Sequence, residues 1–184
     1  SPRHPPLDGR IGVSPPETPS YAAERYLLGP FRWPALFRAV LASRQGRTAE
    51  FNAAWQLALN DQVTRALDME RAPRAQRLAS RLWSALPTPG TAALYAESLR
   101  LGGKLEEASR FVDAAPEGVR SAPAVLVVRA LLARDEGFPA LATGLLSAAA
   151  SRMRAPGIEA LAARPPAEWP STYRKLIAAP RPAY

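Results

Sequence analysis

The stretch GGKLEEASRFVDAAP occupies residues 102–116 and contains small residues that recur 34 positions later in the chain. The recurring pairs are Gly103 and Gly137, Ala108 and Ala142, and Ala115 and Ala149. A fixed period of about 20 to 50 residues is typical of units that stack side by side and bury a shared core. We therefore expect two helical hairpins, over residues 91–115 and 123–152, with a glycine at each turn.

The composition favours helices over sheets. Of the 184 residues, 47% are hydrophobic and 22% are charged, which is ordinary for a globular protein, but only 8% are aromatic. Alanine and leucine supply much of the apolar content, and both are good helix formers, whereas β-branched residues are sparse. The composition predicts an all-α protein.

Helical spacing also extends toward the N-terminus. Gly46 is suited to end one helix and Thr48 to cap the next, which predicts a hairpin over residues 34–59. Irregular helices are expected over residues 60–87. A first unit aligned through Gly46 does not keep the period, so we expect the N-terminal half of the helical domain, residues 34–152, to be divergent.

Proline-rich stretches flank the expected helical domain. Proline cannot donate a backbone hydrogen bond or sit inside a helix, so residues 1–33 are expected to form an extended arm. Residues 153–184 are expected to fold back on the last repeat and cap it. The apolar side chains available for that contact are Trp169, Tyr173, Leu176 and Ile177.

The pattern over residues 91–150 resembles the tetratricopeptide repeat. In residues 102–116 a glycine, a hydrophobic turn residue, an acidic-alanine pair, a larger apolar residue and a final alanine fall in register. The next unit departs from the pattern at Arg129, where a leucine is usual. The resemblance implies a short right-handed α-solenoid, in which Ala96 would cross Ala108 and Ala130 would cross Ala142.

Proteins of this kind bind other proteins in a groove lined by the first helix of each hairpin. By that resemblance, the groove-facing residues are Glu97, Arg100, Val127, Leu131, Arg134 and Asp135. Two alternatives remain open. Val127 and Leu131 could be buried under residues 153–184, and Glu97, Arg100 and Arg134 could be ordinary solvated charges.

The densest aromatic stretch lies near the N-terminus, where arginines are interspersed among the rings. Its aromatic residues are Tyr26, Phe31, Trp33 and Phe37. Such a mixture favours a segment that caps the open end of a helical stack, and the alternative is a segment that lies at a lipid headgroup boundary. We count these four residues among the candidate partner-binding positions.

The formal net charge is +8, and Lys104 and Lys175 are the only lysines, so the excess is almost entirely arginine. Arginine binds carboxylates and phosphates in a bidentate manner, which makes an anionic partner conceivable. The arginines are spread from Arg3 to Arg181 without a dense cluster. This distribution favours a compositional bias over a dedicated nucleic-acid surface, which we keep as the second reading.

The residue types that most catalytic and metal sites need are scarce. The sequence has no cysteine, and His4 is its one histidine. Thiolate zinc sites, cysteine nucleophiles and multi-histidine metal sites are therefore excluded, and no histidine base is expected because His4 lies in the proline-rich arm. Gly102-Gly103 lacks the downstream pattern of a phosphate-binding loop. We expect no enzyme activity, no metal and no cofactor, with an enzyme of unrecognised design as the weakest alternative.

These observations together favour a noncatalytic scaffold or accessory subunit of a larger bacterial-type assembly. Its partners would be other protein subunits, bound through the groove and the proline-rich arms, with contact to a membrane surface as an alternative and nucleic acid less favoured. The chain begins at Ser1, which suggests processing, and it has no apolar run long enough to span a membrane. Analogy with envelope and secretion factors favours a periplasmic or membrane-associated location over the cytoplasm.

Overall fold

The computed structural model describes residues 48–177, with side chains from residue 53 onward, and this part is helical throughout, without strands. The all-α prediction is confirmed for these residues. The helices are α3 (Thr48–Asp68), α4 (Ala72–Ala85), α5 (Pro89–Leu101), α6 (Leu105–Asp113), α7 (Glu117–Arg120), α8 (Pro123–Asp135), α9 (Pro139–Met153), α10 (Pro156–Ala162), the 3-10 helix η2 (Pro166–Glu168) and α11 (Tyr173–Ile177).

Some of the sequence-based expectations concern residues that the structure does not describe. The proline-rich arm over residues 1–33 and the start of the hairpin over 34–59, including Gly46, lie outside the described range. The same holds for the four aromatic candidates, Tyr26, Phe31, Trp33 and Phe37. These expectations stay predictions.

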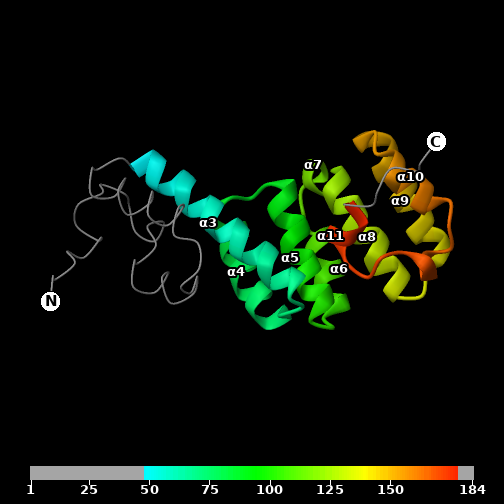
Figure 1. The fold of residues 1–184 in the computed structure, drawn as a ribbon, viewed down its shortest axis with the longest axis horizontal. Coiled ribbons are helices and arrows are strands. Elements are labelled where there is room, and N and C mark those ends of the chain that lie inside the picture. Colours follow the sequence, from blue (N-terminus) through cyan, green and yellow to red (C-terminus); the bar gives the residue numbers. More distant parts are fainter. Residues whose placement is uncertain (1–47, 178–184) are drawn as a thin grey trace, which may run out of the picture.

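The helices pack as consecutive pairs, α3 with α4, α5 with α6, and α8 with α9. Figure 1 shows them following one another in chain order, with α3 and α4 at one end of the helical body and α9 and α10 at the other. The α5 helix also contacts α8, so the first helices of the last two pairs are neighbours. One continuous apolar core runs from Trp55 to Leu176.

The turn inside each pair has the same backbone geometry. In the second pair, the N–H of Gly103 donates to the carbonyl of Arg100 (3.0 Å) and the N–H of Lys104 to that of Leu99 (3.0 Å). This pairing, with Gly103 at φ +75°, is a Schellman C-cap. The third pair repeats it around Gly137, which has φ +87°. The two turn glycines expected from the sequence therefore adopt the left-handed conformation.

The first pair makes the same turn with a glutamate. Glu70 has φ +55°, its N–H donates to the carbonyl of Leu67 (3.0 Å), and the N–H of Arg71 donates to that of Ala66 (2.8 Å). The three turn residues are thus spaced by 33 and 34 positions. Among the described residues, the first unit is therefore the pair α3 and α4 with its turn at Glu70.

This arrangement differs from the expected break after residue 59. The α3 helix continues to Asp68 because its apolar residues keep helical spacing across that point, with Leu59 and Val63 fully buried. The irregular helices expected over 60–87 are instead the end of α3 and the strongly amphipathic α4.

Small or compact residues occupy equivalent buried positions in the three units. Five residues after each turn residue stand Ala75, Ala108 and Ala142, and each is 0% exposed. Seven residues before each turn residue stand Val63, Ala96 and Ala130, which are also 0% exposed. The second and third units thus bury the alanine pairs that the sequence suggested as crossing points between helices.

The expected helix ends are close to those observed, with local differences. The α5 helix begins at Pro89 and not at residue 91, because Thr88 caps it. The Thr88 hydroxyl accepts the N–H of Thr91 (3.3 Å), and the Thr91 hydroxyl accepts the N–H of Thr88 (3.0 Å). The short helix α7 was not expected; it connects the second and third units.

The left-handed glutamate leads to a first prediction. The left-handed conformation strains a non-glycine residue by about 1–2 kcal/mol. Glycine would remove this strain, but it would also increase the conformational entropy of the unfolded chain, which offsets part of the gain in stability. We expect Glu70→Gly to raise the free energy of unfolding by about 0.5–1 kcal/mol. Gly137→Ala is the matched control of opposite sign, since a Cβ there meets no atom within 4 Å and adds only backbone strain. Urea denaturation of both variants checks this, and a destabilised Glu70→Gly chain would contradict it.

Candidate functional site

Residues 169–177, here called the crossing segment, leave the end of the stack and lie back over α5 and α8. In Figure 1 α11, the helical part of this segment, lies beside α8 in the middle of the helical body. Tyr173 and Leu176 are buried, whereas Ile177 is 38% exposed. Trp169 is also buried, and its indole N–H donates to the carbonyls of Leu161 (2.8 Å) and Arg164 (3.2 Å).

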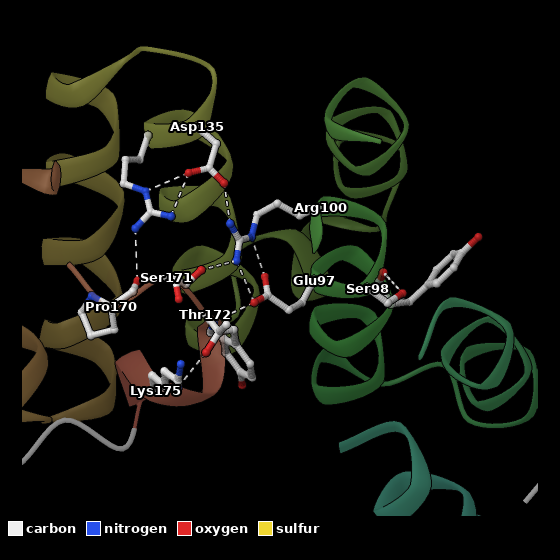
Figure 2. A network of polar contacts seen from close by, with 11 residues as sticks. Glu97, Ser98, Arg100, Asp135, Pro170, Ser171, Thr172 and Lys175 are labelled. Carbon is white, nitrogen blue, oxygen red and sulfur yellow. Dashed lines mark hydrogen bonds and ion pairs between the residues drawn. The ribbon is translucent and has the colours of Figure 1, made fainter. Parts of the chain in front are cut away.

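A buried ion-pair network lies beneath this segment. Arg100 donates from Nε to Oε2 of Glu97 (2.7 Å) and from Nη2 to Oε1 (2.9 Å), which is a bidentate pair on one face of α5. Its Nη1 atom donates to the carboxylate of Asp135 on α8. Glu97 is 1% exposed and Arg100 6%. Figure 2 shows these side chains converging on the crossing segment.

The network binds main-chain atoms of the crossing segment. Arg100 Nη2 donates to the carbonyl of Ser171 (2.6 Å), and Arg134 Nη1 donates to the carbonyl of Pro170 (3.1 Å). In the opposite sense, the N–H of Tyr173 donates to Oε1 of Glu97 (2.8 Å). Three main-chain groups within four residues are thus satisfied by charged side chains, which fixes the path of the segment.

The residues that hold the segment occupy equivalent positions of the repeat. Arg100 and Arg134 each stand three residues before the turn glycine of their unit, and they bind the successive carbonyls of Ser171 and Pro170. Asp135 stands two residues before Gly137, and Asp68 stands two residues before Glu70.

Asp68 extends these contacts to the first unit. Its Oδ1 atom accepts Nε of Arg174 from the crossing segment (2.7 Å). The segment therefore contacts the third, second and first units in turn as its residue numbers rise from Pro170 to Arg174.

The charges of the network balance. Glu97 and Asp135 carry two negative charges, and Arg100 and Arg134 carry two positive ones. Burial by itself would lower the pKa of Arg100, but the hydrogen bonds and charges of Glu97 and Asp135 outweigh that effect and raise the pKa above its ordinary value. Arg100 is therefore a permanent cation, and its two carboxylate partners compensate its burial.

Tyr173 makes the site sensitive to alkaline pH. Burial raises its pKa above the ordinary value of 10.0, and the negative charge of Glu97 raises it further, although Arg174 acts in the opposite direction. The folded state thus holds the phenolic proton more tightly than the unfolded state. The resulting stability is fully present below about pH 10 and is lost as the pH rises from there through the folded-state pKa.

The upward shift of the Tyr173 pKa gives a second prediction. We expect the free energy of unfolding of the natural chain to fall more steeply above about pH 10 than that of Tyr173→Phe, which has no phenolic proton to lose. Urea midpoints measured between pH 9 and 11.5 test this. Tyr95→Phe keeps Tyr173 and should show the steep fall of the natural chain. Parallel curves for the natural chain and Tyr173→Phe would contradict the prediction.

The structure brings together four of the six groove-facing candidates, Glu97, Arg100, Arg134 and Asp135. The alternative that Glu97, Arg100 and Arg134 are solvated charges is wrong. The crossing segment and α8 provide buried partners for Glu97 and Arg100, and Arg134, whose side chain is 17% exposed, binds Asp135 and the carbonyl of Pro170. Val127 and Leu131 are each 0% exposed on α8 and belong to the apolar core. Sequence reasoning missed Asp68, whose place in the repeat becomes visible only when the first unit is aligned through Glu70.

Two further observations concern residues 48–177 as a whole. Their side chains bring together no group of three or more histidine, aspartate or glutamate residues that could hold a metal ion. Within the same residues, no helix has both the length and the apolarity to cross a membrane. The network instead offers fixed donors and acceptors for a polypeptide main chain. No protein-family model, curated protein or solved structure matches this chain.

Proposed function

We propose that this protein is a noncatalytic scaffold or accessory subunit, built as a short right-handed α-solenoid of tetratricopeptide-like hairpins, which holds protein partners in a larger assembly. The repeated turns at Glu70, Gly103 and Gly137 support the repeat architecture, because each closes a helix pair in the same way. The resemblance places the binding face on the first helices of the units.

The observation that carries the proposal is that this face already holds a polypeptide. Arg100, Arg134 and Glu97 bind the main chain of the proline-containing crossing segment. Side chains that bind carbonyls and an N–H group recognise an extended peptide irrespective of most of its sequence, which suits a surface that receives segments of other proteins. The arginines of this site are paired with carboxylates, which favours a protein ligand over the phosphates of nucleic acid.

Purification of the tagged full-length protein from its own cells, in mild detergent and at two salt concentrations, tests this function. Mass spectrometry and a nucleic-acid stain identify what is retained. Protein partners in stoichiometric amounts that survive the higher salt are the expected result. Nucleic acid that is lost at the higher salt, with no retained protein, would overturn the proposal in favour of a basic nucleic-acid-binding module, because phosphate contacts release counterions.

Cross-linking of the retained complex adds a second criterion. Cross-links from a partner to Lys175 of the crossing segment, or to Lys104 at the turn that follows α5, are expected. Cross-links confined to other surfaces would separate the scaffold function from this face and contradict the assignment of the face as the binding surface.

A further inference from the structure

The crossing segment displays the chemistry of a ligand for the face that it covers. Its contacts with the second and third units are made through the carbonyls of Pro170 and Ser171 and the N–H of Tyr173. Any segment that follows the same backbone path, with carbonyls at the first two positions and a free N–H at the fourth, where α11 begins, could make the same bonds. Recognition by these bonds alone would therefore not distinguish the chain's own segment from that of a partner.

Two apolar anchors and one charge add sequence selectivity. Tyr173 is 9% exposed and Leu176 is 0% exposed, and the spacing of three places them on one side of the single turn of α11. Arg174 then points to Asp68 in the first unit. Together these contacts define a ligand pattern of tyrosine, a basic residue, one variable residue and leucine, preceded by a non-helical stretch whose carbonyls bind the arginines. The ligand enters at the third unit and leaves at the first.

The crossing segment has the features of an occupant that can be exchanged. Its helix, α11, has five residues, too few to be stable away from the face. The indole N–H of Trp169 donates to the carbonyls of Leu161, within α10, and Arg164, just after α10. Trp169 can therefore stay in place while the chain beyond it moves. Proline at 170 marks the start of the part that touches the repeats.

The position of Trp169 also bears on the identity of the competing occupant. From this fixed point the eight residues 170–177 can reach at most about 29 Å when fully extended. Such a short reach disfavours exchange of the segment between two copies of the chain, since both copies would have to bring their α10 helices close to the partner's face. A segment of a different protein has no such constraint.

We propose that the crossing segment is an internal ligand that competes with a partner protein for the face of α5 and α8, and that the partner presents a segment of the pattern Tyr-basic-x-Leu, which forms a helical turn from the tyrosine onward and is preceded by a non-helical stretch like Pro170–Thr172. This inference rests on the proposed scaffold function and specifies the chemistry of the partner. Binding of the partner requires release of residues 170–177, so the apparent affinity of the natural chain is reduced by the fraction of time that its own segment occupies the face.

The test uses the full-length protein and a synthetic fluorescent peptide with the sequence of residues 166–177, PAEWPSTYRKLI. The host is the double variant Tyr173→Ala, Leu176→Ala, which loses both anchors and keeps every charged residue of the face. Fluorescence anisotropy is expected to show that the peptide binds this host at least about tenfold more tightly than the natural chain. A peptide with alanine at the positions of Tyr173 and Leu176 is the nonbinding control.

A charge exchange checks the register of the bound peptide. Host Asp68→Lys, made in the double variant, should lose a few-fold in affinity for the natural peptide and regain it for a peptide carrying Arg174→Glu, as expected for a partly exposed ion pair. Where the double variant does not fold by circular dichroism, the single variant Arg174→Glu, altered at a partly exposed position, serves as the host and should bind the natural peptide a few-fold more tightly than the natural chain does.

Each other outcome overturns the inference. Equal affinity of the peptide for the natural chain and the opened host would mean that it binds elsewhere. No binding to the folded opened host at millimolar peptide would mean that the face does not accept a segment in trans. A dimer formed by exchange of residues 170–177, detected by analytical ultracentrifugation, would assign the face to a second copy. None of these results depends on partner capture from cells, so failure of the inference can be told apart from failure of the scaffold function.

Discussion

Replacing Arg100 by methionine should lower the free energy of unfolding by about 3–5 kcal/mol, the largest effect we expect from a single substitution in this chain. The side chain is 4% exposed and binds Glu97, Asp135 and the carbonyl of Ser171. Methionine fills much of the same volume, so the loss comes from the buried carboxylate of Glu97, which keeps the N–H of Tyr173 as a partner but loses its cation. Urea denaturation of the full-length chain measures the change.

A double substitution tests whether the loss of stability comes from the buried carboxylate of Glu97 that is left without its cation. In Glu97→Met, Arg100→Met both charges are gone, so no buried carboxylate is left without its cation, and the loss should be clearly smaller than the sum of the two single losses. Arg110→Met is the matched surface control, because Arg110 and its partner Glu106 are 73% and 87% exposed, and no measurable change is expected. Additive losses in the double variant would contradict a coupled buried pair.

Enlarging the small residue at the start of a second helix should have the next largest effect. Ala142 is 0% exposed on α9, where that helix packs against α8. We expect Ala142→Leu to destabilise the chain by about 1–3 kcal/mol, because the added atoms must push the two helices apart or force strained rotamers. Thermal and urea unfolding provide the measurement.

The same substitution on the other side of α9 provides the control. Ala140 is exposed, so Ala140→Leu adds its atoms to solvent and should leave stability nearly unchanged. The equivalent changes Ala75→Leu and Ala108→Leu should both destabilise, because these positions are also 0% exposed. Tolerance of Ala75→Leu alone would show that α3 and α4 do not pack like the other two pairs.

The turns and helix contacts that could be predicted from the sequence are those that need a particular residue type, such as glycine or alanine. Gly103 and Gly137 predict left-handed turns because glycine adopts a positive φ at little energetic cost. The alanines five residues later, Ala108 and Ala142, predict close helix packing. Glu70 adopts the same left-handed conformation although it is not a glycine, so the sequence does not reveal this turn. The sequence therefore predicts a first unit aligned through Gly46, in which the second helix of a hairpin ends at residue 59 and irregular helices follow, whereas α3 is continuous over Thr48–Asp68.

The residues of the candidate site could be predicted from the sequence, but their surroundings could not. The first-helix positions of Glu97, Arg100, Arg134 and Asp135 could be read from the repeat, but their burial could not. Arg100 is covered by Ser171, 71 positions away, and the bond is to a carbonyl that any residue would offer. Main-chain partners leave no trace in the side-chain sequence, so only the three-dimensional path of the crossing segment reveals them.

The contact between Asp68 and Arg174 has a consequence for how the chain acquires and loses its order. In an array whose units touch only their neighbours, the ends fray first and stability accumulates unit by unit. Here two residues that are 106 positions apart are joined, which links the first unit to the segment that follows the third. Opening of the first unit therefore also breaks a contact of the crossing segment, so the two ends of the helical body are coupled to each other as well as to their neighbours.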